Sequence, residues 1–199
     1  EIKSLSKHEK NELLKAIIES LKNDKDLILK ANKRDIEESQ NKLSNAMIDR
    51  LMLDDQRFKG ILESIKNVIS LDDPTGNILF TNERPNGMIV ERVSVPLGVI
   101  GIIYESRPNV TIDATVLCLK AGNSVILRGG SECFNTNTAM VNSMQKAMQS
   151  KSVSENIVQY VNTTDRAAVD YMLSKMDKYI DVIVPRGCLL YTSDAADEP

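Results

Sequence analysis

Three short segments of the sequence combine residue types that bind phosphate or stabilise an oxyanion. The first, residues 128–132, reads RGGSE and comes directly after an apolar run. Its glycines would let the backbone approach a phosphate closely, and the helix expected next would offer unpaired N–H groups at its positive end. A phosphate-bearing cofactor would therefore fit against the candidate residues of this loop, which are Arg128, Gly129, Gly130, Ser131 and Glu132. An ordinary strand-to-helix turn with a surface arginine stays open as the alternative, since neither GxGxxG nor GxxxxGKS/T is present.

The second segment, residues 104–113, reads YESRPNVTID and follows an apolar run of strand length. Pro108 disfavours helical geometry at Arg107, so Asn109 lies where the next helix begins and its amide can point into the crevice beyond the strand. An amide at this position could donate to an oxyanion formed at a thioester or acyl carbon. We expect Glu105, Arg107 and Asn109 to contact the substrate, with Asn109 as the oxyanion donor. A helix-capping asparagine stays open as the alternative.

The third segment consists of Pro185, Arg186 and Gly187, and it follows the last apolar run of the chain. These residues match no phosphate-binding fingerprint by themselves, so their prediction as cofactor contacts depends on their place after a strand.

Few side chains are suited to covalent or metal chemistry. The sole histidine, His8, lies in the polar N-terminal stretch, far in sequence from the candidate loops. Cys118 falls in an apolar helical stretch, and Cys133 has no histidine or other base near it in sequence. Together with Cys188 they make an odd, widely spaced set, which is typical of reduced thiols in a cytoplasmic protein rather than of disulfides or a zinc site. We expect no metal site.

Composition predicts a globular protein without a polyanionic partner. The chain has 199 residues, of which 42% are hydrophobic, and its net charge of -3 comes from 25 basic and 28 acidic residues. Because these charges are mixed along the chain, we expect no basic face for nucleic acid or for a membrane surface. The longest apolar stretch, residues 95–104, is interrupted by proline and glycine and suits a buried strand rather than a membrane span. We find no signal peptide, and we expect a cytoplasmic location.

The order of apolar patterns predicts an α/β protein. Residues 1–72 carry apolar side chains at helical spacing, and residues 77–95 hold two extended stretches joined by a turn, which we interpret as a β ribbon. From residue 98 onward, apolar runs of strand length alternate with helical stretches: the runs are 99–104, 124–127, 157–161 and 181–184, and the helical stretches are 110–120, 134–149 and 165–176. This alternation predicts a parallel, Rossmann-like sheet with helices on both faces. Such sheets bind ligands beyond the carboxyl ends of their strands.

A longer stretch, residues 92–132, carries a specific resemblance. It reads RVSVPLGVIGIIYESRPNVTIDATVLCLKAGNSVILRGGSE, and the flanking pieces ANKRDI, IDRLML, LDDPTG, TTDRAAV and YIDVIVPRG agree with it. From about residue 5 to residue 187 the sequence resembles γ-glutamyl phosphate reductase, also named glutamate-5-semialdehyde dehydrogenase, within the aldehyde dehydrogenase superfamily. The resemblance implies an aldehyde dehydrogenase-like cofactor domain.

The resemblance also implies an activity, namely the NADPH-dependent reduction of L-glutamyl 5-phosphate to L-glutamate 5-semialdehyde, with release of phosphate, in proline biosynthesis. In that chemistry a cysteine thiolate displaces phosphate, and the thioester then accepts hydride from the nicotinamide. Asn109 would help to hold the oxyanion, Arg128 and Ser131 would meet the 2′-phosphate of NADPH, and residues 185–187 would lie near the pyrophosphate. We expect the full-length enzyme to be a homo-oligomer, with glutamate 5-kinase as a candidate partner.

The chain departs from the family pattern after Gly187. Family members continue there through a second domain that carries the nucleophilic cysteine, and no segment of this sequence matches it. Instead the sequence changes to CLLYTSDAADEP, residues 188–199, which we expect to be an unrelated, disordered tail. We therefore expect residues 1–187 to form an NADP-binding domain that binds its cofactor without turnover, because the covalent step needs the missing nucleophile.

Two other functions stay open at this point. One is a non-catalytic dinucleotide-binding or oligomerisation module, and the other is a different aldehyde or acyl reductase of the same superfamily. The segments YESRPNVT and LRGGSE argue against the second.

Overall fold

The computed structural model describes residues 2–186, so Gly187 and the predicted tail, residues 188–199, lie outside the described residues. The α-helices are α1 (Lys7–Asn23), α2 (Lys25–Ser39), α3 (Asn45–Leu51), α4 (Asp55–Ser70), α5 (Pro108–Lys120), α6 (Phe134–Ser150) and α7 (Ala167–Lys175). The strands are β1 (Ile78–Glu83), β2 (Ile89–Val93), β3 (Val99–Tyr104), β4 (Ser124–Arg128), β5 (Val158–Tyr160) and β6 (Val182–Arg186). Short 3-10 helices lie at Ile2–Ser4, Ser131–Cys133 and Glu155–Ile157. No helix within residues 2–186 has the length and apolar character that crossing a membrane requires.

The central sheet has the strand order β5-β4-β3-β6, and all of its strand pairs are parallel. Ile103 of β3 pairs with Arg128 of β4 on one side and with Pro185 of β6 on the other, so the three strands end at the same level. β3 is buried along nearly its whole length, as expected for a strand that is covered on both faces. The prediction of an α/β fold with a parallel sheet is confirmed.

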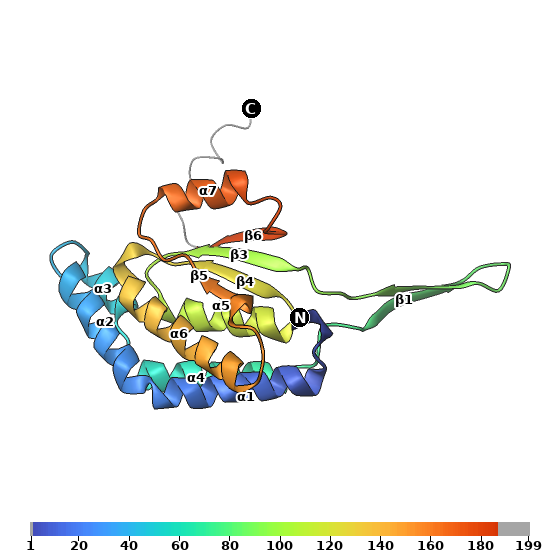
Figure 1. Cartoon of the computed structure of the whole chain (residues 1–199), viewed down its shortest axis with the longest axis horizontal. Helices are drawn as coiled ribbons and strands as arrows, with labels where there is room; N and C mark the ends of the chain where they lie inside the picture. The colour runs from blue at the N-terminus through green and yellow to red at the C-terminus, as the bar shows by residue number, and fades with distance from the viewer. Residues whose placement is uncertain (1, 187–199) are drawn as a thin grey trace.

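Helices cover both faces of this sheet, as Figure 1 shows. α5 and α6 lie on one face, with α1, α2 and α4 forming an outer layer behind them, and α7 lies on the other face. The large core lies on the α5 and α6 side, whereas a small cluster under α7 joins Met172 with Ile103 and Ile180. The N-terminal helices therefore stabilise the sheet from behind α5 and α6.

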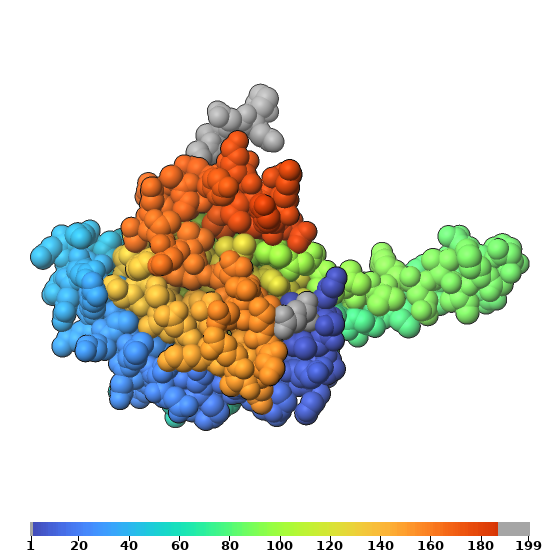
Figure 2. Space-filling model, in the orientation of Figure 1, coloured from blue at the N-terminus to red at the C-terminus, as the bar shows by residue number. Residues whose placement is uncertain are grey.

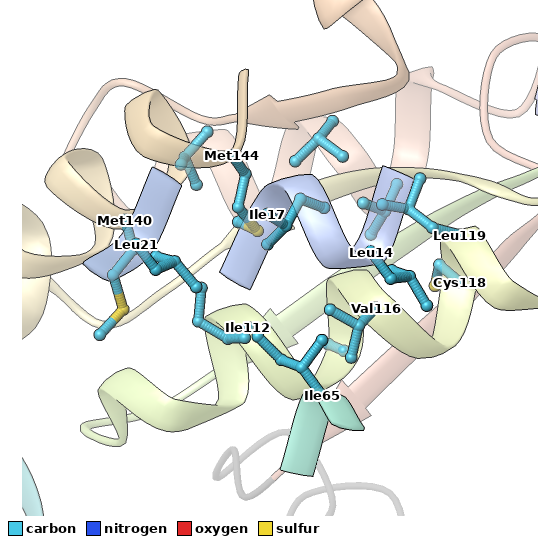
Figure 3. Close-up of a cluster of buried hydrophobic side chains, with 14 of the residues drawn as sticks. Leu14, Ile17, Leu21, Ile65, Ile112, Val116, Cys118, Leu119, Met140 and Met144 are labelled. Atoms are coloured by element: carbon cyan, nitrogen blue, oxygen red, sulfur yellow. The ribbon is translucent and has the colours of Figure 1, made fainter. Parts of the chain in front are cut away.

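The middle of the large core is built by α1 (Figure 3). Leu14, Ile17 and Leu21 recur at helical spacing and are fully buried. The side chains around them come from α4, α5 and α6, and they include Ile65, Ile112, Val116, Leu119, Met140 and Met144. Burying one aliphatic side chain stabilises the fold by about 1.5–3 kcal/mol. This layer therefore anchors the helical N-terminal section to the sheet.

Side-chain caps fix where three of the N-terminal helices begin. Ser6 caps α1 and forms a capping box with Glu9, whose carboxylate accepts from the Ser6 N–H at 2.8 Å. Ser44 and Asp54 cap α3 and α4 by accepting from the backbone N–H three residues later. Each such cap contributes about 0.5–2 kcal/mol, so these helix starts are encoded locally.

β1 and β2 form an antiparallel ribbon that projects away from the body of the molecule (Figures 1 and 2). Gly87 has a φ of +81° in the turn between them, a conformation that glycine adopts readily. The large apolar side chains of the ribbon are exposed, among them Ile78, Leu79, Phe80, Ile89 and Val93. The predicted ribbon is confirmed, and it carries an uncovered apolar surface.

Candidate functional site

The three predicted site segments meet at the carboxyl edge of the sheet. Ser106, which follows β3, donates a hydrogen bond to the carboxylate of Glu132, which follows β4. Arg186, at the end of β6, pairs with Tyr104 at the end of β3. Because neighbouring parallel strands end together here, the segments after β3 and β4 and the end of β6 lie side by side.

Asn109 lies in the first turn of α5 with an exposed side chain. Arg107 occupies the N-cap position of this helix, without a side-chain capping bond, so Asn109 does not have the capping role that the alternative gives it. Its Nδ2 donates to Oδ2 of Asp113 at 3.0 Å, and Oδ1 of Asp113 accepts from the Ser64 hydroxyl at 2.8 Å. Asp113 therefore orients the amide, which keeps a second N–H for a ligand. The oxyanion role of Asn109 stays a prediction.

A cavity of about 390 Å³ opens beside Asn109, between α3, α4 and the first turn of α5. Arg50 and Arg107 line it together with Asp113. Two further charged residues of the lining, Arg57 and Asp49, are paired with each other, because Nη2 of Arg57 lies 2.8 Å from Oδ1 of Asp49. We call this space the Asn109 cavity.

A second cavity, of about 330 Å³, lies at the ends of β3 and β6. Arg50 and Arg107 line it as well, and here they are joined by Arg186 and Glu105. The two cavities therefore share two arginines, and the structure places the predicted substrate residues Glu105 and Arg107 beside Arg186. We call this space the arginine cavity.

The sequence predicts that Arg128 provides a positive charge for a phosphate. In the structure its side chain points into the protein and is only 7% exposed. Its Nη2 donates to the carbonyls of Thr164 and Asp165 at 3.2 and 3.3 Å, and its Nη1 donates to the carbonyl of Gly129. Its Nε is buried without a hydrogen-bond partner among the described residues. The guanidinium thus ties the segments after β4 and β5 together, and its contact with a cofactor stays a prediction.

Neighbouring protein atoms restrict the two glycines of the same loop to different degrees. A Cβ on Gly129 would lie 2.2 Å from Nδ2 of Asn137, and a Cβ on Gly130 would lie 2.2 Å from a carboxylate oxygen of Glu132. Asn137 is fully buried and cannot move away, so packing alone explains Gly129, whereas the flexible, half-exposed Glu132 side chain could move away from a Cβ on Gly130. Ser131 is exposed beside them, and its hydroxyl donates to Glu132 at 3.2 Å. Contact of these four residues with a cofactor stays a prediction.

The N-terminus of α6, which was expected to offer unpaired N–H groups to a phosphate, is occupied by a carboxylate. Asp35 of α2 is 2% exposed and accepts from the backbone N–H groups of Asn135 and Thr136 at 3.1 and 2.7 Å. It also accepts from both side chains. This negative charge at the positive end of the helix removes the donors that the sequence interpretation had assigned to phosphate.

The two described cysteines are buried, and neither is an activated thiol. Burial raises the pKa of Cys133 to about 12 and the pKa of Cys118 to about 11. The prediction that Cys118 belongs to the core is confirmed. Cys133 accepts a hydrogen bond from Asn137 Nδ2 at 3.1 Å and belongs to the packing beneath the loop after β4. Within residues 2–186, the His, Cys, Asp and Glu side chains form no group that could hold a metal ion.

Sequence reasoning missed three charged residues at this edge: Arg50, Asp113 and Asp35. Asp113 follows Asn109 by four residues, so helical spacing alone could have placed both on one face. Arg50 and Asp35 reach the edge from the helical N-terminal section, and no local pattern links them to it.

Comparison with known proteins gives a consistent result. No protein-family model matches the sequence. The sequence is 50% identical over 183 residues to the γ-glutamyl phosphate reductase of Bartonella tribocorum, an alignment that covers 92% of this chain and 45% of that protein. It is 46% identical over 184 residues to the enzyme of the same name from Carboxydothermus hydrogenoformans, with 92% and 44% covered. The chain thus spans less than half the length of the curated relatives it matches.

Solved structures agree with this likeness. The γ-glutamyl phosphate reductase of Thermotoga maritima superposes with a TM-score of 0.92 at 37% identity, over 98% of this chain and 47% of that one. The enzyme of the same name from Saccharomyces cerevisiae gives a TM-score of 0.87 at 31% identity, over 96% and 49%. A probable aldehyde dehydrogenase from Listeria monocytogenes, at 16% identity and a TM-score of 0.69, covering 100% and 41%, shares the fold. The fold is therefore that of γ-glutamyl phosphate reductases and aldehyde dehydrogenases.

Proposed function

We propose that this chain is the cofactor-binding part of a γ-glutamyl phosphate reductase, which reduces L-glutamyl 5-phosphate to L-glutamate 5-semialdehyde and releases phosphate. The observation that carries this proposal is the 50% and 46% identity to relatives of that name across 92% of the chain. Those relatives are more than twice as long as the part that this chain matches. We therefore propose the reductase activity for the complete enzyme, of which this chain is one part. The substrate would be a small acyl phosphate.

NADPH is the nicotinamide cofactor in this proposal, and the carboxyl edge of the sheet fits a phosphate-bearing dinucleotide. Parallel sheets of this kind bind dinucleotides at that edge. Arg128 keeps a buried, unpaired Nε beside the loop, and Ser131 presents an exposed hydroxyl there. Arg186 adds a positive charge at the end of β6. Gly187, the next residue in the sequence, is proposed as a cofactor contact. Bound at this edge, NADPH would supply hydride to the acyl carbon.

Asn109 is the residue of this chain that would act on the reacting atoms. Its free amide N–H would donate to the oxygen of the acyl group, where negative charge develops, and Asp113 would hold the amide in place. We propose that the nucleophile is a cysteine absent from this chain, and that Cys188 is not its counterpart. Cys118 and Cys133 are unsuited to the role, because burial keeps both thiols protonated near neutral pH. Residues 1–187 would then bind cofactor without turnover.

We also propose that the complete enzyme is a cytoplasmic homo-oligomer, and that glutamate 5-kinase, which would supply the unstable acyl phosphate, is its partner. The uncovered apolar side chains of the β1–β2 ribbon support association with another protein surface.

A chimera tests the reductase proposal. Residues 2–186 of this chain would replace the matching part of the Thermotoga maritima enzyme, and NADP- and phosphate-dependent oxidation of glutamate semialdehyde would be measured. We expect an active chimera in which Asn109→Ala lowers kcat by about 10²–10³, the effect of losing one oxyanion donor. The matched control is Asn67→Ala, which removes an exposed asparagine of α4 away from the edge and leaves kcat unchanged. A folded chimera that binds NADPH without oxidising the semialdehyde would contradict the proposal.

The isolated chain tests the cofactor half of the proposal. NADPH fluorescence should saturate on titration with this chain, and the same chain should show no semialdehyde oxidation. Robust turnover would refute the assignment of the nucleophile to another segment, whereas an absence of NADPH binding would refute the assignment of the domain.

A further inference from the structure

Three arginines from separate parts of the chain converge on the arginine cavity. Arg50 comes from α3, Arg107 precedes α5, and Arg186 ends β6. They are far apart in sequence, so only the fold brings them together. A guanidinium group is always charged and presents a fork of donors that matches the oxygens of phosphate.

Among residues 2–186, these three guanidinium groups have no counter-ion. Neither an ion pair within 4.0 Å nor a side-chain hydrogen bond joins Arg50, Arg107 or Arg186 to another described residue. Arg57, by contrast, is paired with Asp49, and Arg34 with Glu38. The one acidic residue that lines the arginine cavity, Glu105, leaves an excess of two positive charges, since three arginines face one carboxylate. The cavity is therefore suited to an anion that carries two negative charges.

The position of this cavity indicates which anion it would hold. Arg50 and Arg107 also line the Asn109 cavity, so the two spaces adjoin. An acyl phosphate whose carbonyl oxygen meets Asn109 would place its phosphoryl group only a few bond lengths away. The first turn of α5 adds the positive end of a helix dipole to the same region.

We propose that Arg50, Arg107 and Arg186 together form the binding site for the phosphoryl group of the acyl phosphate substrate and for the phosphate it releases. This inference rests on the proposed function and adds Arg50, a residue of the helical N-terminal section, to the active site. It also moves Arg186 from the cofactor pyrophosphate to the substrate. A cofactor pyrophosphate also carries phosphoryl groups, so the test has to distinguish binding of the substrate from binding of the cofactor.

The test is a calorimetric titration of the whole chain with inorganic phosphate. The variants are Arg50→Ala and Arg186→Ala, and the matched control is Arg92→Ala, which removes the same charge from the exposed strand β2. We expect each cavity variant to weaken phosphate binding about tenfold or more, as for the loss of a charged hydrogen bond, and the control to leave it unchanged. All three side chains are exposed, so the fold should survive; circular dichroism checks this for each variant. Equal phosphate affinity in Arg50→Ala, Arg186→Ala and the parent chain would overturn the site.

A second phosphate titration, with the chain saturated in NADPH, shows whether the site belongs to the substrate or to the cofactor. Unchanged phosphate affinity under NADPH supports the substrate assignment. Displacement of phosphate by NADPH, with the same dependence on Arg50, would overturn that assignment and give the site to the cofactor. If the chain binds phosphate through these arginines but does not bind NADPH, the proposed function fails while the phosphate site stands.

Discussion

Removing Asp35 should destabilise the whole domain, although this residue lies on a helix outside the sheet. Its carboxylate is buried and accepts from the N–H groups and the side chains of Asn135 and Thr136 at the start of α6. Asp35→Ala would leave these donors without an acceptor and would also remove the negative charge at the helix N-terminus. The contact links α2 to α6, which covers the sheet.

The size of the effect follows from burial. Asn135 is partly exposed, so water can replace its lost partner, but Thr136 is fully buried and cannot be reached in that way. Two unsatisfied donors on Thr136 cost about 1–3 kcal/mol each, and the lost interaction with the helix dipole adds about 0.3–1 kcal/mol. Because the carboxylate no longer has to be buried, we expect a net loss near the middle of this range, about 3–5 kcal/mol.

Urea denaturation of this chain measures the effect. Asp35→Ala should lower the free energy of unfolding by about 3–5 kcal/mol and the melting temperature by about 6–20 °C. Glu37→Ala, on the exposed side of the same helix, is the matched control and should stay within about 0.5 kcal/mol of the parent chain. A loss below about 1 kcal/mol for Asp35→Ala would mean that water or another acceptor satisfies the donors at the start of α6, and it would refute the expected role of Asp35.

Three further predictions concern other parts of the fold. Gly129→Ala should destabilise by about 1–3 kcal/mol, because its Cβ would meet Asn137 Nδ2 at 2.2 Å; Gly60→Ala, with open space around it, should stabilise α4 by about 0.4–1 kcal/mol in urea melts. Burial raises the pKa of Cys133 from 9.0 to about 12, so this thiol should resist iodoacetamide at pH 8 until the chain unfolds. The free energy of unfolding should fall above pH 9, because the thiol ionises first in the unfolded chain. Rapid alkylation of the folded chain would contradict this. Ile89→Lys on the ribbon should reduce light scattering by the concentrated chain, and unchanged scattering would exclude the ribbon as its cause.

Elements that depend on local pattern could be predicted from the sequence. The apolar run at residues 99–104 coincides with β3, and residues 134–149 nearly coincide with α6, because burial on both faces and helical periodicity leave clear signals. Some observed element boundaries differ from the predicted ones. α5 begins at Pro108 rather than at residue 110, since proline is accepted in the first turn of a helix. The strand order β5-β4-β3-β6 carries no local signature in the sequence.

The fate of individual site side chains was harder to predict. The sequence shows that Arg128 follows a strand, but the carbonyls of Thr164 and Asp165 that turn it inward belong to another loop. Asp35 reaches the start of α6 from about a hundred residues away, a separation at which local propensity carries no information. Asn109 was placed correctly at the mouth of α5, because proline restricts the residue before it and fixes where the helix starts.

Binding of a nicotinamide dinucleotide at the carboxyl edge of the sheet is the property on which the proposed function depends. An NMR titration of the isotopically labelled chain with NADPH tests this most directly, because amide shifts report the site residue by residue. We predict that the perturbed amides cluster after β3 and β4, at residues 105–109 and 129–132, and near residues 163–165, while those of the ribbon at residues 78–93 stay unchanged. Saturating NADPH that leaves these segments unperturbed, or that perturbs the ribbon instead, would contradict the claim.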